Sequence, residues 1–207
     1  MSKIVFITSG KIDYILPGKD LYESISITAS GKIFPSLNKE GKLETTRRAE
    51  ELMELNASII YSAPSAQCLE TAEILSKKLT LPLEQDDRLL PLKFDLKSMF
   101  TEEQFESLGE RKFEVLRTGY IKNFFNNKLI DSNREIEKRY KNFILGEILA
   151  NHKNETVLII SHAYLIKLFY IYNQLNENMY ENKEKLFKLF NPAKETMNRL
   201  EMLSLEL

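Results

Sequence analysis

Three short, continuous apolar runs constrain the fold of this chain more than any other feature. They span residues 4–7, 58–62 and 157–161. Strands buried on both faces show such unbroken runs, whereas half-exposed strands alternate apolar and polar residues. Helical patterns follow over 67–77 and 163–175, and the end of the chain, RLEMLSLEL, alternates like a final strand. This order predicts an α/β three-layer sandwich, with a mainly parallel central sheet, right-handed crossovers and helices on both faces.

The segments around the second strand are less regular. After Gly10 comes a long stretch punctuated by prolines and glycines, which we expect to be irregular. Thr45 and Thr46 can then cap a helix that carries an apolar stripe. Residues 81–92 are bounded by prolines, which favours a short edge strand followed by a turn.

The middle of the chain has a helical pattern. Residues 101–152 predict mainly helix, and Thr101 with Gln104 fits a capping box at its start. Nothing in the sequence marks a boundary between domains. We therefore expect one domain over 1–207, with a mainly helical insert at about 95–152 that covers the sheet edge.

Composition and charge exclude several classes of function. The 207 residues carry 29 basic and 30 acidic side chains, and no basic stripe indicates nucleic-acid binding. Cys68 is the only cysteine, so neither an internal disulfide nor a cysteine-rich zinc site is possible. The N-terminal residues do not fit a signal peptide, and no apolar run approaches the roughly 18 residues of a membrane span. A soluble cytoplasmic protein is expected.

The three strong strands end in small and polar residues. These ends are Thr8–Gly10, Ser62–Gln67 and Ser161–Ala163. In open α/β sheets, ligands bind beyond the carboxyl ends of the strands, so the three ends should converge on one site.

These strand ends give the chain a resemblance to the histidine phosphatase superfamily, which has the phosphoglycerate mutase-like fold. In that family the strand ends read Arg-His-Gly, Ser-Pro-x-x-Arg and Ser-His-Gly, and a Thr-Ala pair, an Arg-Leu and an Asn-Pro-Ala occur at set places. The matching stretches here are, in chain order, Thr8-Ser9-Gly10, Ala63-Pro64-Ser65-Ala66-Gln67 with Thr71-Ala72, Arg88-Leu89, Ser161-His162-Ala163 and Asn191-Pro192-Ala193. The resemblance covers nearly the whole chain in order and spacing.

The departures from the family pattern concern its chemistry. The resemblance implies that Thr8 replaces the first phosphate-binding arginine, Ser9 the histidine nucleophile and Gln67 the second arginine, while Pro91 or a neighbour replaces the acid. Only His162 remains of this set. Loss of a covalent nucleophile costs about 10⁶-fold in rate in a well-studied hydrolase. Each hydrogen bond to a charged group contributes about 1.5–3 kcal/mol.

The sequence therefore predicts a degenerate family member that lacks the catalytic Arg-His-Gly and has no phosphatase or mutase activity. Its function would be ligand binding, protein interaction or regulation. We expect no confident catalytic residue, but a relic pocket formed by Thr8, Ser9, Gly10, Gln67 and His162. Thr8 and Gln67 could hydrogen-bond a polar ligand, although we favour a self-satisfied network.

Two alternatives remain open at this stage. One is an active phosphatase or esterase-type hydrolase that uses Ser9 with His162, which would be a phosphoric ester hydrolase if it acts on phosphate esters. The other is a flavodoxin-like domain, disfavoured because no helix follows the first strand directly. His152 precedes the third strand and should lie at the wrong end of it. We expect Lys11 to be a solvated loop residue. Asp86 and Asp87 lie just before the expected acid position and could enter the pocket, but we favour a turn-stabilising role for both.

No cofactor or metal site is indicated. The partner is predicted to be an unidentified protein or small molecule, with neither nucleic acid nor membrane involved, and a homodimer is compatible with the resemblance.

Overall fold

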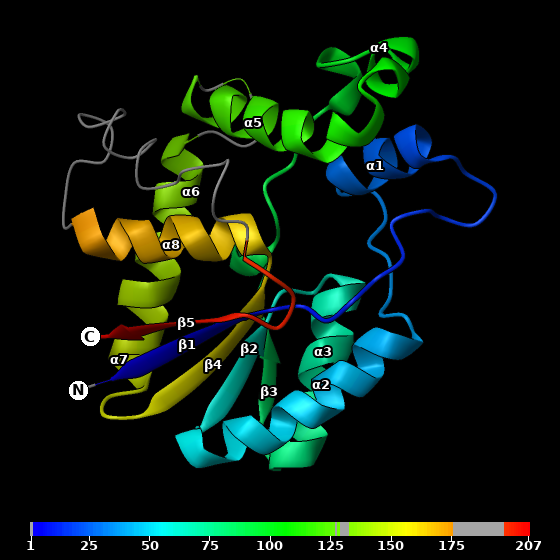
Figure 1. Ribbon diagram of the computed structural model, residues 1–207. Helices are drawn as coiled ribbons and strands as arrows, with labels where there is room; N and C mark the ends of the chain where they lie inside the picture. The colour runs from blue at the N-terminus through cyan, green and yellow to red at the C-terminus, as the bar shows by residue number, and fades with distance from the viewer. Residues whose placement is uncertain (1, 127, 129–132, 176–196) are drawn as a thin grey trace.

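The computed structural model describes residues 2–126, 128, 133–175 and 197–207, and within them a central sheet organises the fold (Figure 1). Its strands are β1 (Lys3–Thr8), β2 (Ile59–Ser62), β3 (Leu83–Gln85), β4 (Thr156–Ser161) and β5 (Met202–Glu206). They lie in the order β3-β2-β4-β1-β5, and β5 alone of these five runs antiparallel to its neighbour. The predicted α/β fold with a mainly parallel sheet is confirmed.

Helices cover both faces of this sheet. Phe6 of β1 and Tyr61 of β2 share one face, because both pair in register with Ile159 of β4. Phe6 packs on Phe169 of α8 (Ala163–Leu175), and Tyr61 packs on Phe143 in the π-helical stretch Lys141–Ile148. Helices α2 (Lys39–Leu52) and α3 (Ala66–Leu79) pack against each other and lie on the other side of the sheet in Figure 1.

Helix α2 starts earlier than the sequence predicts. Asn38 is its N-cap and accepts a hydrogen bond from Gly41 N at 2.9 Å. Thr45, the predicted cap, is buried within the helix and donates to Gly41 O at 2.7 Å. The prediction was wrong because asparagine caps a helix at least as well as threonine, and Asn38 comes first along the chain.

The stretch after Gly10 is not wholly irregular, since it contains α1 (Leu21–Ala29). Asp20 caps this helix by accepting a hydrogen bond from Glu23 N at 2.8 Å. The Pro17-Gly18 pair that suggested a loop lies just before the cap, where it interrupts no helical hydrogen bond.

Helix α1 packs with helices from the middle of the chain. These are η3 (Leu96–Ser98), α4 (Glu102–Ser107) and α5 (Lys112–Phe125). Their shared apolar cluster consists of Tyr22, Ile25, Leu96, Phe105 and Leu116. The predicted capping box at the start of α4 is confirmed, with Thr101 Oγ1 accepting from Gln104 N at 3.2 Å and Gln104 Oε1 from Thr101 N at 2.9 Å. In Figure 1, α1, α4 and α5 form a group beyond the carboxyl ends of the strands.

The remaining short elements connect these layers. They are η1 (Met53–Leu55), η2 (Asp87–Leu89), η4 (Gly109–Arg111), α6 (Asn133–Tyr140) and α7 (Leu149–Asn151). Among the described residues, no helix combines the length and apolarity that crossing a membrane requires.

Candidate functional site

The sheet register brings the predicted strand ends together. Thr8 pairs with Ser161, and Ser62 pairs with Ile160, so β1, β2 and β4 end at the same edge. Ser9 and His162, each the first residue after its strand, therefore lie on neighbouring strands. We call Ser9, Gly10, Gln67 and His162 the strand-end site.

His162 is held by an unexpected partner, Ser65. The Ser65 Oγ and His162 Nε2 lie 2.8 Å apart. Ser65 is the N-cap residue of α3, yet its side chain makes no capping hydrogen bond because it faces the imidazole. The residue as a whole is partly buried, and protein atoms surround its ring closely enough that burial lowers the pKa of His162 to about 4. The ring is therefore neutral at neutral pH.

Gly10 is needed for packing between α2 and α3. Its N–H donates to Thr71 Oγ1 at 3.0 Å. A Cβ at this position would lie 2.7 Å from Thr45 Oγ1 and 3.0 Å from Gly41 O. The glycine thus lets the turn after β1 lie directly against both helices.

Thr8 and Gln67, which we expected to share a self-satisfied network, behave differently. Thr8 Oγ1 donates to Asn198 O at 2.6 Å and accepts from Glu201 N at 3.1 Å, so its side chain is committed to the turn before β5. Gln67 is only 8% exposed, and among the residues that the structure describes its Oε1 has no hydrogen-bond partner. A buried acceptor left unpaired costs about 1–3 kcal/mol. The expectation of a satisfied network was therefore right for Thr8 and wrong for Gln67.

Of the two carboxylates just before the family's acid position, Asp86 is used for structure. Asp86 caps η2 through Arg88 N at 2.8 Å and forms an ion pair with the Arg88 guanidinium. Arg88 Nη1 also donates to Asn142 O at 2.8 Å. Ser161 Oγ donates to Leu89 O at 2.7 Å and so fastens η2 to the end of β4. Asp86 has the turn-stabilising role that the sequence favoured.

The other candidate side chains are also engaged. Lys11 Nζ forms a surface ion pair with Glu40 Oε2 at 2.5 Å. Its charge is therefore balanced by Glu40, and Lys11 does not take the place of a missing phosphate-binding arginine. His152 directly follows α7, before β4 begins, and bonds to Glu155 Oε2 at 2.9 Å and Tyr61 Oη at 3.0 Å. The Asn191-Pro192-Ala193 match lies outside the described residues.

Arg199 is a residue near the site that sequence reasoning missed. Its Nη1 donates to Gly10 O at 2.8 Å, and its guanidinium carbon lies 5.3 Å from the centre of the Tyr14 ring. Arg48 of α2 donates to Leu200 O at 2.8 Å and helps to fix the turn that carries Arg199. The arginine stands 189 residues from Gly10, so no local pattern could have linked the two.

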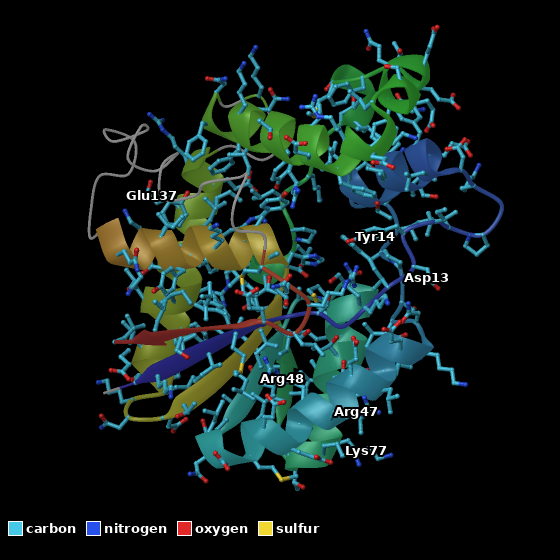
Figure 2. The ribbon with its side chains drawn as sticks, in the orientation of Figure 1. Asp13, Tyr14, Arg47, Arg48, Lys77 and Glu137 are labelled. Atoms are coloured by element: carbon cyan, nitrogen blue, oxygen red, sulfur yellow. The ribbon has the colours of Figure 1, made fainter. Side chains whose placement is uncertain are left out.

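Aromatic side chains surround this edge of the sheet. We call Tyr14, Phe34, Phe113 and Tyr164 the aromatic rim. Phe34 lies 6.0 Å from the His162 ring and Tyr14 lies 5.6 Å from Phe113 of α5. Burial raises the pKa of Tyr164 to about 12, and the positive charge of Arg117 acts in the opposite direction. Figure 2 shows Tyr14 between α1 and α3, on the segment that joins the helical group to the sheet.

Comparisons with known proteins agree with this architecture. Residues 24–183 match the histidine phosphatase superfamily (branch 1). Phosphoserine phosphatase 1 of Hydrogenobacter thermophilus is 26% identical over 141 residues, which span 68% of this chain and 65% of that protein.

Three of the solved structures with a similar fold come from mycobacteria, Bacillus stearothermophilus and Entamoeba histolytica. A mycobacterial glucosyl-3-phosphoglycerate phosphatase complexed with VO3 has a TM-score of 0.67 at 16% identity, covering 99% of this chain and 90% of that one. YhfR of Bacillus stearothermophilus has a TM-score of 0.65 at 16% identity, with coverages of 100% and 92%. A mutant phosphoserine phosphatase of Entamoeba histolytica, bound to phosphoserine, has a TM-score of 0.59 at 19% identity, with coverages of 99% and 90%.

The structural likenesses concern the fold alone, whereas the family match concerns the sequence itself. That match covers most of the chain and includes Gln67 and His162, although it begins after Gly10. Together with the converging strand ends, it shows that this chain belongs to the histidine phosphatase superfamily (branch 1).

Proposed function

We propose that this chain is a degenerate histidine phosphatase that has no phosphatase or mutase activity and keeps the strand-end site for ligand binding, with a regulatory or interaction role. The state of His162 is the observation that carries the proposal. It is the one imidazole among the residues of the strand-end site, and its Nε2 is bonded to Ser65. The place that the family resemblance assigns to the nucleophile holds the Ser9 hydroxyl.

The charges at the site support the same conclusion. A transferring phosphoryl group spreads negative charge over three oxygens, which fixed cations must stabilise. The side chains of Thr8 and Gln67 are uncharged, and Lys11 is paired with Glu40. Among these residues and the neighbouring turn before β5, Arg199 at Gly10 is then the single cation without a carboxylate partner, fewer than the two arginines of the family pattern. The low pKa of His162, about 4, keeps its ring neutral as well. Loss of the nucleophile alone corresponds to about 10⁶-fold in rate.

A serine hydrolase is less compatible with the geometry. Within the described residues, the side-chain hydrogen bond to the His162 ring comes from Ser65, and none joins it to Ser9. Ser65 has an exposed fraction of 0%, so a substrate could not reach its hydroxyl without rearrangement. A nucleophile needs both an adjacent base and access to the substrate, and neither serine combines the two.

Turnover assays test this proposal. Two substrates are suggested by relatives: phosphoserine, and 3-phosphoglycerate, which is bound in another structure of the Entamoeba histolytica phosphoserine phosphatase. The other two are p-nitrophenyl phosphate and p-nitrophenyl acetate. The Entamoeba histolytica phosphoserine phosphatase serves as the positive control for the phosphoserine assay. We expect this chain to give the rate of the buffer blank on all four. Turnover that disappears in His162→Ala, or a phosphorylated side chain trapped during the reaction, would contradict the proposal.

A further inference from the structure

Arg199 presents an unused pair of donors beside the strand-end site. Its Nη1 is taken by Gly10 O, which leaves the Nε–H and Nη2–H edge of the guanidinium. Within the described part of the chain, that edge has no hydrogen-bond acceptor and the side chain has no carboxylate partner. These two parallel N–H groups match the two oxygens of a carboxylate.

Exposed aromatic surface lies next to this guanidinium. Tyr14, whose ring Arg199 covers, is 52% exposed, and Phe113, which contacts Tyr14, is 42% exposed. Large aromatic side chains that contact each other while half exposed can pack on the apolar body of a ligand. The cation and this apolar surface are therefore adjacent, as a ligand with a charged end and an aromatic body would require.

The charge balance favours a singly charged group. Arg199 supplies one positive charge at Gly10. The neighbouring residue Lys11 adds no second charge for a ligand, because it is paired with Glu40. Arg117 of α5 acts electrostatically on Tyr164 of α8. A phosphate dianion would need a second cation on the same oxygens, whereas a carboxylate needs one guanidinium.

We propose that the ligand is a small aromatic carboxylate, whose carboxyl group binds the free edge of Arg199 and whose ring packs against Tyr14 and Phe113. The inference rests on the proposed function only in that the ligand is bound and not converted. Gly10 holds the guanidinium in place, and the half-exposed rings provide the apolar contact.

Calorimetric titration of the purified chain tests the inference, with benzoate as the probe and benzamide as its uncharged isostere. We expect benzoate to bind and benzamide to bind at least tenfold more weakly. Arg199→Gln should weaken benzoate binding at least tenfold, which corresponds to about 1.4 kcal/mol, and Tyr14→Leu several-fold. Arg47→Gln is the matched control, because Arg47 is exposed on α2 and Figure 2 shows it well apart from Tyr14.

Each outcome decides the question. Equal binding of benzamide, unchanged binding in Arg199→Gln or no binding of benzoate at millimolar concentration would overturn the inference. Phenyl phosphate binding tenfold tighter than benzoate would overturn the choice of a carboxylate. If Arg199→Gln does not fold, Tyr14→Leu decides alone, since Tyr14 is largely exposed. Benzoate contains no phosphate ester, so a failure here leaves the turnover result, and with it the absence of phosphatase activity, unaffected.

Discussion

Acid is expected to destabilise the fold through His162, and His162→Gln is expected to remove that effect. In the folded chain, burial lowers the pKa of His162 from 6.5 to about 4. In the unfolded chain the ring binds a proton near pH 6.5. Between these values the unfolded state binds more protons, so the free energy of unfolding falls as the pH falls. The stabilisation is complete above about pH 6.5 and is lost by about pH 4.

The size of the effect follows from the two pKa values. Each pH unit in the window contributes about 1.4 kcal/mol, so the interval from 6.5 to about 4 corresponds to about 3 kcal/mol. His162 as a residue is only partly buried, and access of solvent weakens the penalty for the charged form. We therefore expect about 2 kcal/mol between pH 7.5 and pH 4.5. Ser65 does not offset this loss, because a neutral hydroxyl does not pair with the imidazolium as a carboxylate would.

Urea unfolding at pH 7.5 and pH 4.5 measures this difference for the wild type and His162→Gln. His152→Gln is the control, because the chain has two histidines and His152 lies at the other end of the sheet. Between the two pH values, the wild type should lose about 2 kcal/mol more of its free energy of unfolding than His162→Gln does. His152→Gln should show the same loss from His162 as the wild type. If His162→Gln loses as much stability as the wild type, or NMR titration gives His162 a pKa near 6.5, the reasoning is refuted.

Three further substitutions test other parts of the structure by urea unfolding. Gly10→Ala should lower the free energy of unfolding by about 1–3 kcal/mol, because its Cβ would meet Thr45 Oγ1 at 2.7 Å. Gly146→Ala is the control and should leave the free energy of unfolding unchanged, because its Cβ would meet only Lys141 O, at 3.6 Å. Asn38→Ala should cost about 1 kcal/mol through loss of the α2 cap, and an unchanged value would show that the cap is dispensable. Gln67→Leu should be neutral or stabilising by about 1 kcal/mol, since it removes an unpaired buried oxygen; a large loss would mean that the oxygen has a partner.

Local patterns in the sequence were sufficient to predict the strands and their mainly parallel arrangement, but not their order in the sheet. The apolar runs that became β1, β2 and β4 are continuous because both faces of each strand are covered, and this signal needs no knowledge of the contacts. The same parallel arrangement also predicted that Ser9 and His162 lie at the same edge of the sheet, as the pairing of Thr8 with Ser161 confirms. The resemblance carried by those ends led to the family, which the match over 24–183 then showed.

Helix starts were predicted less well, because several residues compete to cap the same helix. Thr45 has the right chemistry for a cap, but Asn38 forms it, and α1 lies within a stretch whose prolines and glycines suggested a loop. Side-chain caps depend on the local backbone conformation, which composition alone does not determine.

The partners at the candidate site were decided by tertiary structure alone. Ser65 and His162 are 97 residues apart, and Arg199 and Gly10 are 189 residues apart. Periodicity and propensity act over a few turns of chain, whereas these contacts exist because the sheet and the turn before β5 bring distant segments together. The sequence by itself thus determined which residues stand at the strand ends. Packing determined that the imidazole there is neutral and bound to Ser65, and that the cation at Gly10 comes from the far end of the chain.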